Sequence, residues 1–316
     1  MRTFARKADL TRKGHPPMDD SFTPLLTTTD WNAEWKELQR ARRHVDDATY
    51  WDERAKTFTT KDSPNPYVER FLRLAKIQDG ESVFDMGCGT GAIALPLAAS
   101  GHEVTAADFS SGMLSGLRER AGKEGAAGIE TIQMSWEDDW EEHGVAPRSR
   151  DVCTASRSIA VDDMRLALLK LSAVARRRVA ITLPTGSSPR TDARVLEALG
   201  LANRVGRDHL YAIAMLVNLG FEPEVGYIKS ARLDTFASVD DAVAKYRKMV
   251  ESQAAFVPEK RVQVALAKLR PWVESQLVEN ENAGKPDEKG VEQGVLRLAT
   301  PRVISWAHIS WNVKES

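Results

Sequence analysis

The chain has 316 residues, 42% of them apolar, and a formal net charge of −1 at pH 7. This composition argues against global disorder, and the near-neutral charge argues against a general electrostatic attraction to nucleic acid. No apolar run approaches the roughly 20 residues of a membrane-spanning helix. The only cysteines, Cys88 and Cys153, are too few for a disulfide framework or a zinc cluster, so we expect a cytoplasmic protein without bound metal.

The N-terminal part predicts a tail followed by helices. Residues 1–20 are basic but lack the apolar stretch of a secretory signal, and an Arg-rich transit peptide is the alternative. We expect residues 1–27 to be disordered, with Met18 as a possible second start. Residues 28–75 are predicted to form a helical cap. Its helices are expected at 30–44, where Trp31, Trp35 and Leu38 share one face, and at 47–58 and 65–77.

Strands and helices then alternate, which is typical of a parallel sheet covered by helices on both faces. We assign residues 76–235 to this α/β, doubly wound domain, with its site at the carboxyl ends of the strands. Strands are expected at 82–87, 103–108, 129–134, 151–156, 178–184 and 221–230. Helices are expected at 92–99, 112–124 and 162–176, and in a region that ends near residue 219.

The alternation stops after the sixth strand, and residues 236–300 are predicted to be a helical insertion. Apolar periodicity predicts helices at 238–250 and 259–277, the second kinked or ended near Pro271. The polar stretch 279–290 is expected to be a mobile loop. Residues 301–316 contain the final strand, "RVISWAHISWNV".

The stretch "SVFDMGCGTGAIALPLA" places Gly87, Gly89 and Gly91 directly after the first strand. Glycines in such a turn let backbone N–H groups and the following helix approach a ligand closely. With Ala92 the spacing also satisfies the G-x-G-x-x-A pattern of dinucleotide enzymes. However, Asp85 stands two residues before the first glycine, where a negative pyrophosphate would be poorly accommodated.

Three motifs occur in order: D-x-G-x-G-x-G from Asp85, D-F-S-x-x-M-L from Asp108, and "MSWEDDW" after the third strand. Together they resemble class I S-adenosylmethionine-dependent methyltransferases over residues 65–230, and more weakly at "YWDERAKTF". The resemblance implies a seven-stranded sheet whose last strand is antiparallel. It also implies S-adenosylmethionine as cofactor, with Asp85 at its ammonium group, Asp108 at the ribose, and Glu137 or Asp138 at the adenine. The implied cofactor-binding residues are Asp85, Gly87, Cys88, Gly89, Gly91, Asp108, Phe109, Met113, Trp136, Glu137 and Ser156.

The fourth strand ends in "TASRSIAV" and lacks the (D/N)-P-P-(Y/F) signature of amide and base-amine methylation. The resemblance at "YWDERAKTF" is to the small-molecule members of the family, and it implies methyl transfer to an oxygen, nitrogen or sulfur atom of a small molecule. Candidate catalytic residues are His209, Tyr211, His308 and Arg157, and candidate substrate-binding residues are Tyr50, Trp51 and Arg157. For Arg157 a structural ion pair is the competing interpretation. The cap and the insertion are expected to form a lid over the acceptor.

Three other functions compete with this interpretation. An RNA or protein methyltransferase would require a basic or extended groove, which the composition does not indicate. A non-enzymatic cofactor-binding module would bind S-adenosylmethionine without turnover, and the intact set of acids and glycines speaks against it. A nicotinamide-dependent dehydrogenase would respond optically to its own cofactor.

Overall fold

The computed structural model describes residues 24–42, 48–55, 65–159, 161–189, 191–201, 206–287 and 291–314. The chain divides into two compact units, residues 1–30 and 31–316. In the first unit, α1 (Leu25–Thr28) is a single exposed turn, and the hydroxyls of Thr27 and Thr28 donate to the Pro24 carbonyl. This turn lies inside the range predicted to be a disordered tail. The rest of that prediction, residues 1–23, lies outside the described residues.

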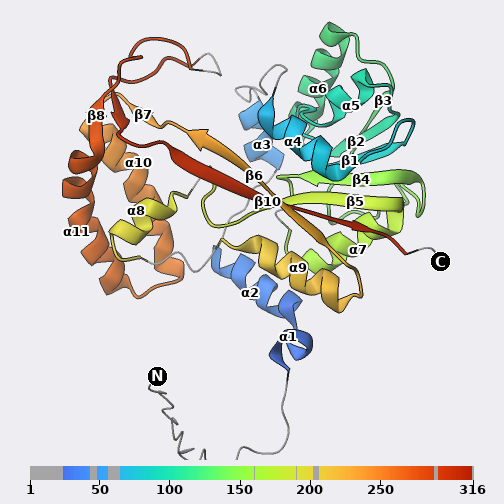
Figure 1. The fold of residues 1–316 in the computed structure, drawn as a ribbon, viewed down its shortest axis with the longest axis horizontal. Helices are drawn as coiled ribbons and strands as arrows, with labels where there is room; N and C mark the ends of the chain where they lie inside the picture. Colours follow the sequence, from blue (N-terminus) through green and yellow to red (C-terminus); the bar gives the residue numbers. More distant parts are fainter. Residues whose placement is uncertain are drawn as a thin grey trace, which may run out of the picture. The chain divides into compact units, whose positions relative to one another are not determined.

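The second unit is built on a seven-stranded sheet of order β3-β2-β1-β4-β5-β10-β6 (Figure 1). The strands β1 to β5 pair in parallel, and β10 is antiparallel to both of its neighbours. This confirms the predicted α/β, doubly wound, mostly parallel sheet with an antiparallel last strand. The strands are β1 (Val83–Met86), β2 (Val104–Asp108), β3 (Ile129–Gln133), β4 (Arg150–Ser156), β5 (Ala175–Pro184), β6 (Glu224–Arg232) and β10 (Arg302–Asn312).

Helices cover both faces of the sheet, as the alternation of strands and helices predicts. On one face, α2 (Trp31–Arg42), α7 (Met164–Val174) and α9 (Asp208–Asn218) bury Trp35, Leu168 and Met215. On the other face, α4 (Pro66–Ala75), α5 (Ala94–Ala99) and α6 (Ser111–Glu124) bury Phe71, Leu97 and Leu117. The short α3 (Ala48–Ala55) packs on α6.

The predicted N-terminal cap is not one structural element, because α2 and α4 belong to the cores of opposite faces. Trp35 of α2 is 1% exposed, and its Nε1 donates to the Val161 carbonyl at 2.8 Å. Phe71 of α4 is fully buried. Each helix buries its apolar face against a different layer, so these helices are part of the folded core and not a lid. The segment 56–64 that joins α3 to α4 lies outside the described residues.

The insertion forms an accessory subdomain with a core of its own, which lies at the end of the long β6–β10 pair (Figure 1). Its small sheet, of order β7-β9-β8, was not predicted. The core also recruits α8, which precedes the insertion in the chain. The elements are α8 (Ala193–Ala198), β7 (Thr235–Phe236), α10 (Val239–Glu251), the 3₁₀ turn Ser252–Ala255, α11 (Glu259–Gln276), β8 (Leu277–Glu279) and β9 (Leu296–Leu298).

One local prediction for the insertion is wrong, and a second holds for its described residues except the first. The helix predicted to kink or end near Pro271 continues through it to Gln276, and Leu269 and Val273 on either side are fully buried. Packing of these side chains outweighs the backbone hydrogen bond that proline removes. The stretch 279–290, predicted to be a loop, begins in β8. Beyond β8, Asn280 Nδ2 donates to the Gly294 carbonyl at 2.7 Å.

Candidate functional site

Two buried carboxylates stand at the carboxyl ends of neighbouring strands. Asp85 of β1 is 1% exposed, and its Oδ1 accepts a hydrogen bond from Thr154 Oγ1 of β4 at 2.7 Å. Its Oδ2 is buried and has no hydrogen-bond partner among the described residues. Burial raises the pKa of Asp85 to about 7, although the Thr154 hydroxyl acts against the shift. A buried acceptor of this kind is costly unless a cation or donor completes it.

Asp108 at the end of β2 ties two turns together. Its Oδ2 accepts the Gly89 N–H at 2.9 Å, and its Oδ1 accepts the Ser110 N–H at 3.0 Å. Burial raises the pKa of Asp108, and the two backbone N–H groups oppose that rise. Each carboxylate oxygen has a further lone pair, so Asp108 can accept two more hydrogen bonds from a ligand.

The three glycines of the turn serve different purposes. All have positive φ, at 70° for Gly87, 55° for Gly89 and 85° for Gly91. A Cβ on Gly87 would lie 2.3 Å from Ser158 Cβ, and one on Gly91 would lie 3.0 Å from Leu95 Cγ. A Cβ on Gly89 would meet nothing within 4 Å. The predicted close approach of backbone to ligand is therefore available at Gly89, whereas the other two glycines accommodate the protein itself.

A hollow of about 360 Å³ lies beside Asp108, lined by Phe109, Gln133, Met134, Ser135 and Asp138. The sequence left Glu137 and Asp138 as alternatives for the adenine-binding acid. Asp138 lines the hollow and accepts the Ser135 N–H at 2.8 Å, whereas Glu137 is exposed and is not part of the lining.

The walls around this hollow are fixed by bonds to α7 and to the turn after β4. Lys170 of α7 donates to the carbonyls of Trp136 and Asp138 at 2.8 and 2.7 Å. Trp136 Nε1 donates to the Ser158 carbonyl at 3.2 Å, so its polar atom serves the protein. Met113, in the N-terminal turn of α6, is buried.

A cluster of three hydroxyls and one cation lies at the ends of β4 and β5. The hydroxyl of Tyr67, from the first turn of α4, is 2.8 Å from both Ser156 Oγ and Thr182 Oγ1. The backbone N–H of Arg157 donates to Thr182 Oγ1 at 2.9 Å. The Arg157 guanidinium carbon lies 4.2 Å from the centroid of the Tyr67 ring. The fold thus brings Tyr67 and Thr182 to the sequence-predicted pair Ser156 and Arg157.

Three predicted site residues are part of the packing. Cys88 is 6% exposed within one core. His308 is 1% exposed, packs against Phe71, and burial lowers its pKa to about 4. Tyr211 donates its hydroxyl to Glu34 Oε1 at 2.7 Å, which joins α9 to α2. His308 is therefore not available to a substrate, and the hydroxyl of the half-buried Tyr211 is engaged by Glu34.

The other candidates lie closer to the strand ends. His209, near the start of α9, has its Nδ1 3.2 Å from the carbonyl of Pro184, the last residue of β5. Tyr50 is 44% exposed on α3, and its ring meets Trp51 edge to face. Asp52 Oδ1 fastens α3 to the turn after β2, because it accepts Ser110 Oγ at 2.6 Å and the Gly112 N–H at 2.9 Å.

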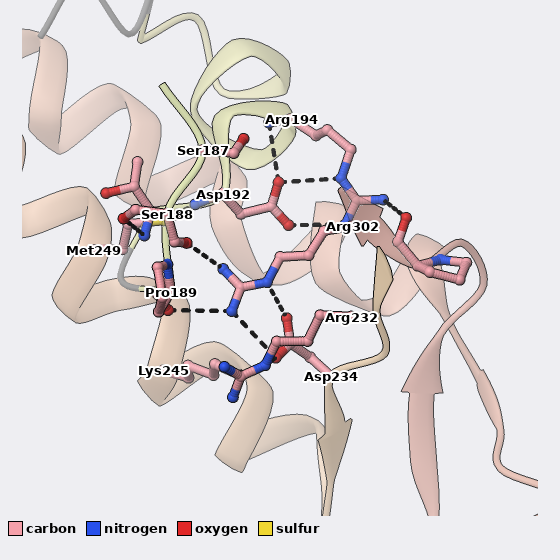
Figure 2. Close-up of polar contacts among 12 residues, drawn as sticks. Ser187, Ser188, Pro189, Asp192, Arg194, Arg232, Asp234, Lys245, Met249 and Arg302 are labelled. Carbon is pink, nitrogen blue, oxygen red and sulfur yellow. Dashed lines mark hydrogen bonds and ion pairs between the residues drawn. The ribbon is translucent and has the colours of Figure 1, made fainter. Parts of the chain in front are cut away.

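The loop after β5 is anchored by a buried ionic network that joins sheet and accessory subdomain (Figure 2). Arg302, at the start of β10, donates to the carbonyls of Ser188 and Pro189, each at 3.1 Å. Its Nε lies 2.9 Å from Asp234 Oδ2, an ion-pair contact without hydrogen-bond geometry. Asp234 also faces Lys245 of α10 at 2.9 Å.

Sequence reasoning missed several residues that shape this region: Asp52, Tyr67, Thr154, Ser158 and Thr182. Only Tyr67 had a usable signal, because Asn65 and Pro66 form a helix start that places it in the first turn. The others come from separate strands and loops. Within the described residues, no group of three or more His, Cys, Asp or Glu is gathered as for a metal ion. No helix in the described ranges has the length and apolarity to cross a membrane.

Comparison with known proteins gives a family match and one protein relative. Residues 83–177 match the family model described as "Methyltransferase domain". A protein of Haemophilus influenzae described as uncharacterized is 34% identical over 182 residues, which are 57% of this chain and 66% of the relative. The matched part is thus just under two thirds of that relative's length.

Two solved structures show distant likeness. The YcgJ protein of Bacillus subtilis is 13% identical, with a TM-score of 0.49, over 79% of this chain and 99% of that one. A methyltransferase of Thiobacillus denitrificans, solved with S-adenosylhomocysteine, is 13% identical, with a TM-score of 0.46, over 85% and 99%. These alignments are too distant to bear on function.

The family match begins at β1 and includes the turn that carries Asp85 and the glycines. The seven strands and the antiparallel last strand were implied by the same family resemblance, and the structure places that strand, β10, between β5 and β6. Motif, topology and family match agree that residues 83–177 form a methyltransferase domain, with the sheet that the resemblance to class I S-adenosylmethionine-dependent methyltransferases implied.

Proposed function

We propose that this protein transfers the methyl group of S-adenosylmethionine to an oxygen, nitrogen or sulfur atom of a small-molecule acceptor. The observation that carries the proposal is the buried Oδ2 of Asp85, which has no partner among the described residues. It stands at the mouth of a glycine turn whose Gly89 N–H is held by Asp108. A cationic ammonium group at Asp85 would complete this acceptor, and the pair of acids would disfavour a pyrophosphate.

The other parts of the cofactor have matching groups in this arrangement. The spare lone pairs of Asp108 suit the two ribose hydroxyls. The hollow lined by Phe109 and Asp138 offers an aromatic wall and a carboxylate for an adenine and its amino group. This assignment gives Asp138, and not Glu137, the role at the adenine.

When bound, S-adenosylmethionine supplies an electrophilic methyl carbon on a good leaving group. The protein therefore has mainly to align the acceptor atom with that carbon. An acceptor that keeps its proton at neutral pH also needs a base. His209 is suited to this because burial lowers its pKa, which favours the neutral imidazole that a base requires.

A direct test uses the full chain and S-adenosylmethionine labelled in its methyl group, incubated with fractionated small-molecule and macromolecular extracts. We expect label in a low-molecular-weight product identified by mass spectrometry. Label in RNA or protein would overturn the small-molecule assignment. Binding of S-adenosylhomocysteine without any labelled product would indicate a non-catalytic binding module, and calorimetric absence of binding would refute the cofactor assignment.

A further inference from the structure

Arg157 is an exposed cation in an unusual backbone conformation. Its φ of 60° is left-handed, and of the described non-glycine residues only Lys76 and Arg148 also have positive φ. Lys76 is the C-cap of α4, where this conformation is ordinary. An arginine held in the left-handed region costs about 1–3 kcal/mol and is typical of functional sites.

The guanidinium of Arg157 is positioned but not neutralised. It lies over the Tyr67 ring, whose own hydroxyl is fixed by Ser156 and Thr182. No residue in the described ranges forms an ion pair or side-chain hydrogen bond with this guanidinium, so the competing structural ion pair has no support there. The contact with the Tyr67 ring holds the guanidinium in place and leaves its N–H groups for a carboxylate or phosphate.

The position of Arg157 separates it from Asp108 and the hollow. Asp108 and the hollow follow β2 and β3, whereas Arg157 follows β4 and is bonded to Thr182 of β5. Asp85 lies on β1, the strand next to β4, and is bonded to Thr154 of β4. With strands about 4.8 Å apart, β4 and β2 are separated by about 10 Å. An anion would be attracted to Arg157 and repelled by the acid pair.

The geometry points to an acceptor that carries a carboxylate or phosphate group, which the Arg157 guanidinium binds while the reactive atom faces the methyl group. This inference rests on the proposed methyl transfer and names the class of acceptor for the same site. Arg157 acts in it as a specificity-determining residue.

The first test measures the melting temperature of the full chain, saturated with S-adenosylhomocysteine, in sodium phosphate or acetate against sodium chloride at equal ionic strength. We expect either anion to raise the melting temperature. Arg157→Asn, which tolerates positive φ, should abolish the rise, and Arg157→Lys should keep part of it. Arg73→Gln, an exposed arginine at the other end of α4, is the control and should behave as wild type.

The second test distinguishes the acceptor's anion from the carboxylate of the cofactor itself. Calorimetry compares S-adenosylhomocysteine with 5′-methylthioadenosine, which lacks the amino-acid half. We expect Arg157→Asn to change both dissociation constants less than about twofold, far below the tenfold that 1.4 kcal/mol would give. A tenfold loss confined to S-adenosylhomocysteine would overturn the assignment to the acceptor.

Equal anion effects in wild type and Arg157→Asn, or none in either, would overturn the anion site. If the wild-type protein did not bind S-adenosylhomocysteine, the proposed function would be wrong. The anion titration can be repeated without S-adenosylhomocysteine, and it then tests the anion site at Arg157 separately.

Discussion

Ser158 lies directly against Gly87. Its Oγ donates to the Met86 carbonyl at 2.7 Å, and a Cβ on Gly87 would come within 2.3 Å of Ser158 Cβ. The turn after β1 and the turn after β4 therefore pack closely together because Gly87 has no side chain. The first glycine of the motif is therefore required for packing within the protein, whether or not a ligand is bound.

We therefore expect Gly87→Ala to destabilise the protein by about 2–5 kcal/mol, because a left-handed backbone and a steric clash both oppose the new methyl group. Ser158→Gly in the same chain should recover the part due to the clash. Urea unfolding of the two single variants and the double variant measures the coupling. Strictly additive effects would contradict this close packing.

Gly89→Ala should behave in the opposite way. Its Cβ faces open space, so we expect a loss of about 1–2 kcal/mol in stability from the positive φ alone. The added methyl group should obstruct the approach of the cofactor, with at least a tenfold rise in the dissociation constant of S-adenosylhomocysteine measured by calorimetry. An unchanged dissociation constant would show that the cofactor does not approach the turn at Gly89.

The two neighbouring acids after β3 form a matched pair. Asp138→Asn should weaken binding of S-adenosylhomocysteine by about tenfold, because a hydrogen bond to a charged group is worth about 1.5–3 kcal/mol. Glu137→Gln should leave the dissociation constant within about twofold of wild type, since its side chain is not in the lining of the hollow. Weaker binding in Glu137→Gln with unchanged binding in Asp138→Asn would show that Glu137 is the adenine-binding acid.

The raised pKa of Asp85 predicts that the stability of the unliganded protein depends on pH. Its folded pKa of about 7 exceeds the ordinary value of 3.8, so the folded state binds the proton more tightly than the unfolded state. Its contribution to stability is therefore full below about pH 4 and is lost as the pH rises toward 7. Urea midpoints of wild type and Asp85→Asn between pH 4.5 and 7.5 test this. The difference, variant minus wild type, should grow with pH, and a constant difference would refute it.

From the ionic network of Figure 2 we expect that removing one of its charged side chains lowers the free energy of unfolding strongly. Asp234→Ala leaves the 3% exposed Arg302 without its carboxylate, and we expect a loss of about 3–5 kcal/mol in unfolding free energy. Glu119→Ala, which breaks an exposed pair with Lys123, should cost less than about 1 kcal/mol. Unfolding free energies are measured by chemical denaturation. Equal losses in Asp234→Ala and Glu119→Ala would show that the buried network does not stabilise the accessory subdomain.

The sequence by itself determined the elements that depend on local order. The turn after β1 needs its acid and glycines at fixed spacings, and the alternation of strands and helices follows from hydrophobic periodicity. These local constraints were sufficient for the parallel part of the sheet, whereas the antiparallel last strand was implied by the resemblance that the motifs carry. The helix start at Asn65 and Pro66 could also be predicted from the sequence. The contacts that this start gives to Tyr67 could not.

The tertiary structure alone decided what each side chain meets. Amphipathic periodicity predicts that α2 and α4 bury one face, but the choice of sheet face depends on contacts more than 100 residues away, such as Trp35 with Val161. In the same way, the contact between Arg157 and Tyr67 joins two turns that are distant in the chain. Residues from separate strands meet only when the strand order is set, and their spacing in the sequence carries no trace of that meeting.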